Sequence, residues 1–221
     1  MLASSPPPDR AGTEQAAAAA RVLAEAAAAA PNSSGEAVAR AFLVAGAPRQ
    51  LFALVSGHDS SKSSGGGGAG GGIRFACEDA IIALHSIAAL IPDHIGDAAV
   101  DTRSLPALLA AAGSNGVTYS AAARAAACNI LVAAAHCAEN IAAMMHAGAG
   151  DRMVQLIVAC GSAGNDPVGD AAADVIRRLI SVGGARADAP ATLVRVGSEM
   201  ICLPRHPRYC RPSSLKSDGI T

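Results

Sequence analysis

The clearest pattern of apolar and polar positions lies between Glu139 and Ile157. A short first segment carries apolar residues at the three- and four-residue spacing of one helix face: Ile141, Met144 and Met145. Gly148 follows that segment, where a helix end commonly needs a positive φ. A second segment repeats the spacing with Met153, Leu156 and Ile157. The pattern predicts two short helices joined at a sharp corner, which need neighbouring helices to bury their apolar faces.

The same pattern occurs twice more in the chain. Residues 42–55 align with it without a gap and place Gly46 at the corner, whereas residues 98–109 form a weaker copy with Arg103 there. The corners at Gly46, Arg103 and Gly148 are 57 and 45 residues apart, and the longer interval contains a Gly/Ser-rich insert. Without the insert, both intervals approach the roughly 40–47 residues of a three-helix solenoid repeat.

Longer apolar segments flank these pairs. They predict helices at residues 14–30, 73–91, 120–135 and 171–182, with Thr13 and Asp170 as N-caps. The second of these helices has a predicted buried stripe of Phe75, Ala80, Ile81, Leu84, Ile87 and Ala88.

The corner motif resembles the armadillo repeat. The residues that carry the resemblance are the Ala-Gly-Ala corner at Gly148, the apolar Leu-x-x-Leu-Leu-like run after it and Glu139-Asn140 before it. Residues 104–109 are similar to the family's Ala-Leu-Pro-x-Leu-Val segment, and residues 83–88 to its third helix. The resemblance covers about residues 15–184. It implies an all-α fold, a right-handed superhelix of about three to four repeats at 13–184, with a HEAT-type repeat as the alternative.

Composition agrees with packed helices. Hydrophobic residues make up 51% of the chain and aromatic residues only 2%, because alanine dominates. Alanine favours helices, whereas a β-sandwich needs β-branched and aromatic residues. The formal net charge of −1 gives the chain no electrostatic attraction to nucleic acid or to an anionic membrane. No apolar run reaches the roughly 20 residues of a membrane span.

The remaining segments predict the domain borders and the compartment. Residues 1–12 predict a disordered lead without a secretory signal, residues 58–72 a flexible insert, and residues 185–221 a partly disordered basic tail. The six cysteines form no tight disulfide framework. An intracellular compartment, cytoplasmic or nuclear, is therefore expected.

Candidate chemistry in the sequence is weak. Cys202, His206 and Cys210 have metal-like spacing, but a structural zinc needs four ligands. The glycines at 65–72 follow no strand and lack the lysine of a phosphate-binding loop, so no cofactor is expected. Residues 58–60 are His, Asp and Ser, the residue types of a catalytic triad. A triad is built from positions distant in the sequence, so these adjacent residues are expected to form a loop. His136 and Cys137 could form a nucleophile pair, but the sequence shows no partner that would orient them. We therefore predict no metal, no catalytic residue and no enzymatic activity.

The armadillo resemblance implies a binding face. Third helices line the concave face in that family, and nuclear-import adaptors clamp an extended peptide there with asparagines. The matching positions here are Ser86, Asn129 and Arg178, although a shifted gap would place Ala133 in the position of Asn129. A carboxamide can both donate to and accept from a peptide unit. Only one of these three positions holds an asparagine, and the chain has no Trp. Binding of a nuclear-localisation signal is therefore disfavoured.

The function predicted from these features is a non-enzymatic protein-interaction scaffold that holds a protein or peptide partner along the concave face. It takes no small-molecule substrate. The alternatives are the substrate-recognition part of a U-box/armadillo ubiquitin ligase, although no U-box is present, and, less favoured, a nuclear-transport adaptor. The exposed ends of so short an array predict either dimerisation or capping by a further domain.

Overall fold

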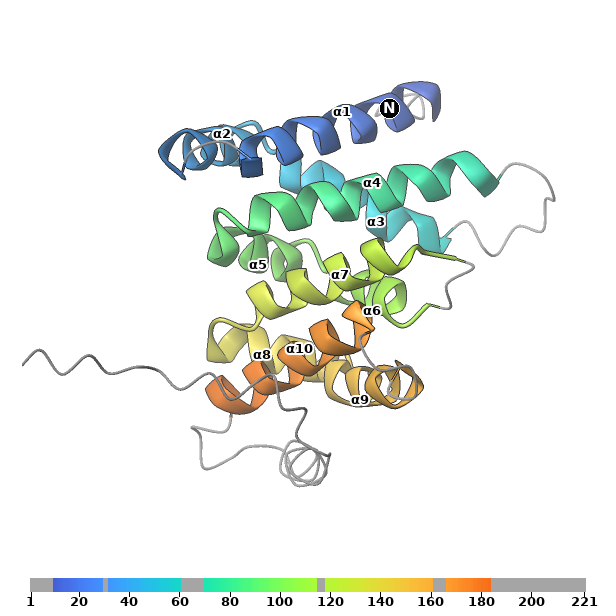
Figure 1. Ribbon diagram of the computed structural model, residues 1–221, viewed down its shortest axis with the longest axis vertical. Coiled ribbons are helices and arrows are strands. Elements are labelled where there is room, and N and C mark those ends of the chain that lie inside the picture. Colours follow the sequence, from blue (N-terminus) through green and yellow to red (C-terminus); the bar gives the residue numbers. More distant parts are fainter. Residues whose placement is uncertain (1–9, 30–31, 61–69, 115–117, 161–165, 184–221) are drawn as a thin grey trace, which may run out of the picture.

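The computed structural model describes residues 10–29, 32–60, 70–114, 118–160 and 166–183. All regular secondary structure in these residues is α-helical, which confirms the predicted all-α class (Figure 1). The helices are α1 (Arg10–Ala29), α2 (Asn32–Val44), α3 (Ala47–Ser60), α4 (Gly70–Ala88), α5 (Pro92–Asp101), α6 (Leu105–Ala112), α7 (Ala121–Ala134), α8 (Ala138–His146), α9 (Ala149–Cys160) and α10 (Pro167–Gly183).

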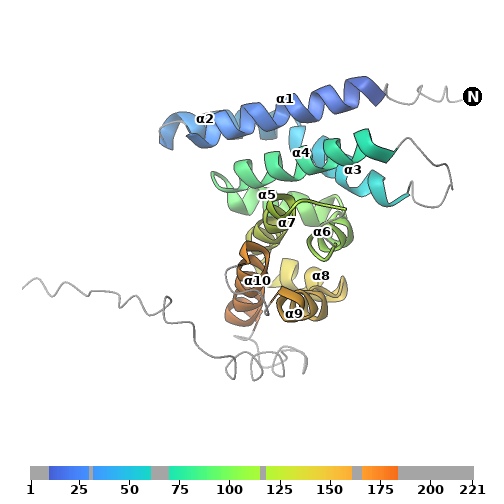
Figure 2. The same ribbon diagram turned by 45° about the vertical axis from the view of Figure 1, so that its right-hand side comes forward.

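The helices pack with a regular order along the chain. In succession, α1 packs on α4, α4 on α7 and α7 on α10, so these four helices form one row (Figures 1 and 2). Helices α3, α6 and α9 also contact one another in order, and α5 contacts α8. In each of these pairs a helix contacts the third one after it. The molecule is therefore a stack of helices, with α1 and α2 at one end and α8 to α10 at the other (Figure 1).

The three predicted corners have the backbone conformation that the pattern requires. Among the described residues, positive φ occurs at Gly46 (72°), Arg103 (56°) and Gly148 (80°). At the middle corner, the amide of Arg103 donates to the Val100 carbonyl at 2.9 Å and that of Ser104 to the Ala99 carbonyl at 3.0 Å. These two hydrogen bonds form a Schellman motif, which satisfies the last carbonyl groups of α5. The corner thus forms at the same place in all three copies, even where glycine is missing.

The core consists of small and branched aliphatic side chains between the helices. In α4, five of the six predicted stripe residues are buried: Ala80, Ile81, Leu84, Ile87 and Ala88. The side chain of the sixth, Phe75, lies outside the described part of the structure. Close packing depends on one glycine in particular, since a Cβ at Gly96 of α5 would lie 2.5 Å from the Ala133 carbonyl oxygen of α7. Helices α5 and α7 are therefore close enough that only glycine fits at this position.

Two predicted borders near the N-terminal half are wrong. Helix α1 begins at Arg10, so Thr13 lies inside the helix and does not cap it, and the end of the predicted disordered lead is helical. Helix α3 extends to Ser60 and α4 begins at Gly70, so both ends of the predicted insert at 58–72 are helical. The glycines at the start of α4 disfavour a helix by themselves, but the packing of α4 on α1 and α3 stabilises it. Residues 61–69 lie outside the described residues.

The predicted start of the last helix is also wrong. Helix α10 begins at Pro167, and its first amides are capped by Asp166, whose Oδ1 accepts from the Val168 amide at 2.9 Å. Proline is favoured at the first helical position because its fixed φ suits the helix and no amide donor is lost. Asp170, the predicted cap, is an exposed residue within α10. The predicted C-terminal tail lies outside the described residues.

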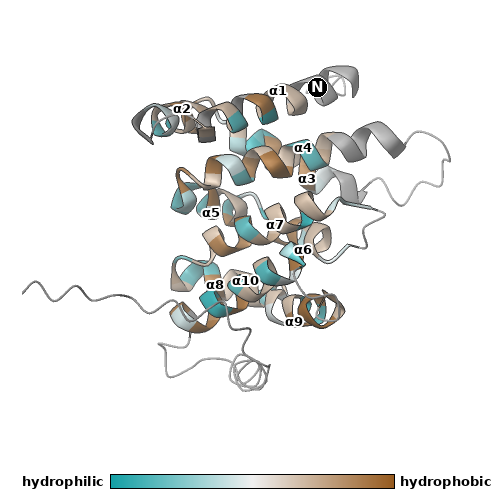
Figure 3. Ribbon diagram, viewed as in Figure 1, coloured by the Kyte–Doolittle hydropathy of each residue, from teal (hydrophilic) through white to brown (hydrophobic). Residues whose placement is uncertain are grey.

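Polar and apolar residues are interspersed on the helices (Figure 3). No single described helix is both long and apolar enough to cross a membrane. Only when taken together are the segments Ser34–Val44 and Ala47–Gly57 long and apolar enough for a membrane span. They are bent by 67° at the corner between them.

Candidate partner-binding face

The three predicted binding positions lie on neighbouring helices of one row. Ser86 is on α4, Asn129 on α7 and Arg178 on α10. In each case the residues three and two positions before it and one position after it are buried: Ala83, Leu84 and Ile87; Ala126, Ala127 and Ile130; Val175, Ile176 and Leu179. The three positions therefore share one helical register, and we call them the ladder stripe. Ala133, the alternative position on α7, has the same pattern, since Ile130, Leu131 and Ala134 are also buried.

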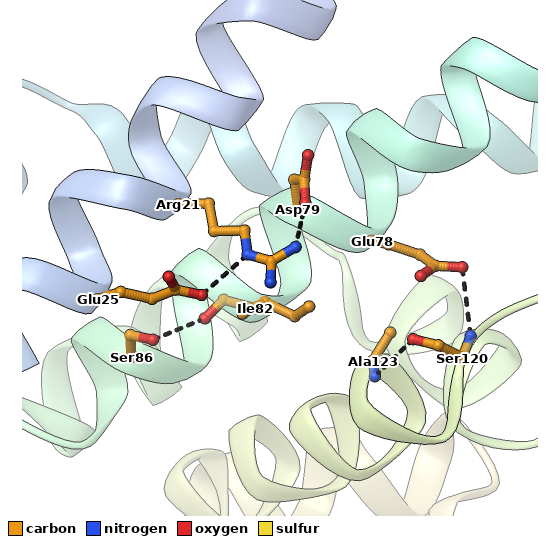
Figure 4. A network of polar contacts seen from close by, with 8 residues as sticks. All are labelled: Arg21, Glu25, Glu78, Asp79, Ile82, Ser86, Ser120 and Ala123. Carbon is orange, nitrogen blue, oxygen red and sulfur yellow. Dashed lines mark hydrogen bonds and ion pairs between the residues drawn. The ribbon is translucent and has the colours of Figure 1, made fainter.

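The ladder-stripe side chains differ in what they can offer a partner. The Ser86 hydroxyl donates to the Ile82 carbonyl of its own helix at 3.0 Å (Figure 4), so it is left as an acceptor. Asn129 is half-buried, and its carboxamide has no hydrogen bond within the described residues. Arg178 is exposed, and its guanidinium forms no ion pair with any described residue. The stripe thus presents an acceptor, a group that both donates and accepts, and a cation.

An ion network beside Ser86 was not predicted from the sequence. Arg21 on α1 donates to Glu25 Oε1 at 2.8 Å and to Asp79 Oδ1 of α4 at 2.7 Å (Figure 4). Asp79 precedes Ser86 by seven residues, or two helical turns, so it lies on the same side of α4. The hydrogen bonds that Arg21 donates, first to Glu25 and then to Asp79, raise its pKa. The four-residue spacing of Arg21 and Glu25 is visible in the sequence, but Asp79 is 58 residues away from Arg21 and is brought there only by the packing of α1 on α4.

Two capping contacts set the position of α7 relative to α4. The Ser120 hydroxyl accepts from the Ala123 amide at 3.2 Å, which caps the first turn of α7. The Ser120 amide in turn donates to Glu78 Oε1 of α4 at 3.2 Å (Figure 4). The start of α7, the helix that carries Asn129, is therefore tied to α4, the helix that carries Ser86.

His136 has partners that the sequence did not reveal. Its Nε2 lies 3.3 Å from Asp97 Oδ1, and its Nδ1 lies 3.2 Å from the Ala133 carbonyl oxygen. Asn140, which is only 6% exposed, donates to the same Asp97 oxygen at 3.0 Å. The Asn140 amide nitrogen also lies 3.5 Å from His136 Nδ1. His136 and Asn140 thus both contact Asp97, and together they link α5 to α8 and to the turn before it.

The buried thiols are poor nucleophiles. Burial raises the pKa of Cys128 to about 12 and also raises the pKa of Cys160, so both are protonated at neutral pH. No group of three or more His, Cys, Asp or Glu side chains within the described ranges is arranged to hold a metal ion. The predicted metal-like spacing at Cys202, His206 and Cys210 lies outside these ranges.

Comparison with known proteins adds a fold likeness. No protein-family model matches this chain, and no curated protein matches it. Among solved structures, an engineered protein from the Northeast Structural Genomics Consortium matches with a TM-score of 0.58 at 22% identity, over 86% of this chain. The chain spans 64% of the length of that engineered protein. At this identity the likeness concerns the fold alone.

Proposed function

We propose that this chain is a non-enzymatic protein-interaction scaffold that binds a partner segment across α4, α7 and α10. The observation that carries the proposal is the shared register of Ser86, Asn129 and Arg178 on three successive helices of one row. A linear row of equivalent positions suits an extended ligand, because each helix meets a different part of it.

The proposal includes an armadillo-like right-handed superhelix, whose concave face would be the row of α4, α7 and α10. Support comes from the positive-φ corners, each of which lies between the first and second helices of a triplet: α2–α4, α5–α7 and α8–α10. Packing of each row helix on the third helix after it supports the same repeat unit. Helix α1 would then be the third helix of an incomplete first repeat.

The chemistry of the ladder stripe suits a peptide main chain. An extended segment leaves its N–H and C=O groups unpaired, and the Asn129 carboxamide can bind one of each. The positions one and two turns before Asn129 on α7 are Ala125 and Ala122, which are half-buried and exposed, respectively. Such short side chains let a main chain approach the carboxamide closely.

Affinity capture from native lysate tests the proposal. We would compare the unaltered chain, a stripe variant carrying Asn129→Ala and Arg178→Glu, and a control carrying Gln155→Ala and Arg152→Glu. The two control sites are exposed on α9, outside the stripe. Circular dichroism would verify equal helicity. We expect a partner that the unaltered and control chains retain, that the stripe variant loses, and that slows hydrogen exchange in α4, α7 and α10.

Equal capture by all three proteins would show that the stripe is not the binding face. Protection confined to α3, α6 and α9 would instead place the partner on the opposite row, and the proposal would be wrong in that form.

A further inference from the structure

We infer that the partner segment is charge-segregated, with an acidic side chain opposite Arg178 and a basic side chain opposite the Glu25–Asp79 pair. The inference rests on the proposed function, because it names the chemistry of the segment that the same row would bind. It comes from the distribution of charge along α1, α4, α7 and α10.

The α1–α4 end of the row is acidic. Glu25 and Asp79 share the single guanidinium of Arg21, so two carboxylates face one cation. The side chains of Glu25 and Asp79 remain 49% and 22% exposed, so a second cation can reach them. His85, the neighbour of Ser86, adds no opposing charge at neutral pH, because burial lowers its pKa. A lysine or arginine of the partner would therefore complete the charge balance at this end.

The α10 end of the row carries a cation at the ladder stripe. Arg177 pairs with Asp174 on the exposed face of α10, whereas Arg178 has no ion pair among the described residues. Asp174 lies one turn before Arg178 on α10, but its carboxylate is already paired with Arg177. Asp170 is a further turn away, about 12 Å from Arg178 along the helix axis. Arg178 is thus placed to bind a carboxylate of the partner.

The middle of the row is neutral. On α7, the stripe side consists of Ala122, Ala125 and Asn129, so no charge interrupts the two ends. Two helix-to-helix steps of about 9 Å separate α4 from α10, and three separate α1 from α10, which gives roughly 18–27 Å. An extended chain covers that distance in about five to eight residues at about 3.3 Å per residue. The acidic and basic side chains of the partner are expected at about this separation.

A displayed library of random ten-residue peptides tests the inference. It is selected on the unaltered chain, on Arg178→Glu and on the control Arg152→Glu, at low and at physiological salt. We expect enriched peptides with an acid near one end and a base near the other, and about three- to tenfold weaker binding when the acid is replaced by its amide. With Arg178→Glu, the acidic position should become basic, while Arg152→Glu should leave the selection unchanged.

The failures of the two proposals are distinguishable. Enriched peptides without charge segregation, or a preference that survives Arg178→Glu, would overturn the inference. If Asn129→Ala still abolished their binding, the proposed function would stand. A selection that enriches no peptide would also overturn the inference, and capture of a folded partner, followed by hydrogen exchange, would then decide the proposed function independently.

Discussion

Arg103 occupies the same left-handed corner position as Gly148, with φ of 56° against 80°. In both cases the amide of the corner residue donates to the carbonyl three residues earlier, at 2.9 Å and 3.0 Å, respectively. Arginine has a Cβ that disfavours this conformation by roughly 1–2 kcal/mol. The corner is stabilised elsewhere, since the buried Ser104 hydroxyl contacts the Thr102 hydroxyl at 2.8 Å and the Ser56 hydroxyl at 3.1 Å.

Replacing Arg103 with glycine should stabilise the protein. Glycine removes the steric cost of positive φ but increases the entropy of the unfolded chain, so we expect a net gain of about 0.5–1 kcal/mol in unfolding free energy. The matched change Gly148→Ala should lose about 1 kcal/mol, because its φ is strained even though a Cβ meets no atom within 4 Å. Urea denaturation of both variants measures the difference. A destabilised Arg103→Gly would show that the arginine side chain itself holds the corner.

Gly96→Ala should destabilise the stack by about 2 kcal/mol or more. The added Cβ would lie 2.8 Å from the Ala134 Cα, and backbone atoms of α7 cannot move away without separating the helices. Gly57→Ala is the matched control, because this α3 glycine has no atom within 4 Å and alanine is the better helix former. The control should be neutral or gain up to about 1 kcal/mol. Thermal unfolding of the two variants would contradict the packing argument if they shifted equally.

Asn140→Ala should cost about 1–2 kcal/mol in unfolding free energy. The carboxamide is buried, and its removal leaves the Asp97 oxygen with one donor fewer. The exposed change Gln155→Ala should stay within about 0.5 kcal/mol of the unaltered chain. Chemical denaturation followed by circular dichroism provides both values. An Asn140→Ala variant as stable as the control would remove the proposed cross-link between α5 and α8.

His85 should make stability decrease in mild acid. Because burial lowers its pKa, the unfolded state binds a proton at a higher pH than the folded state does. Its stabilising effect is complete above the unfolded pKa of about 6.5 and is lost as pH falls from there towards the lowered folded pKa. We expect His85→Asn to reduce the loss of unfolding free energy between pH 7.5 and 5.5. The exposed change His94→Gln serves as the control, and equal slopes in all three proteins would refute the role of His85.

Local pattern alone predicted the elements whose signals are short-range. The corner at Gly148 follows from apolar spacing and one glycine, and the buried stripe of α4 follows from helical periodicity. The start of α10 was misplaced because Asp166 and Asp170 are both good caps, and only the Val168 amide distinguishes them. The binding-site prediction placed Ser86, Asn129 and Arg178 in one register by alignment, but it missed every ionic contact around them.

The sequence by itself determined that this chain is helical and where three helices end in a corner. These features depend on residues within one or two turns of each other. Only the tertiary structure decided that Arg21 reaches Asp79, that His136 faces Asp97, and that Ser104 beside the Arg103 corner contacts Ser56 of α3. Each of these features depends on a contact between segments that are distant in the sequence. Such a contact stabilises the protein only after the helices have packed.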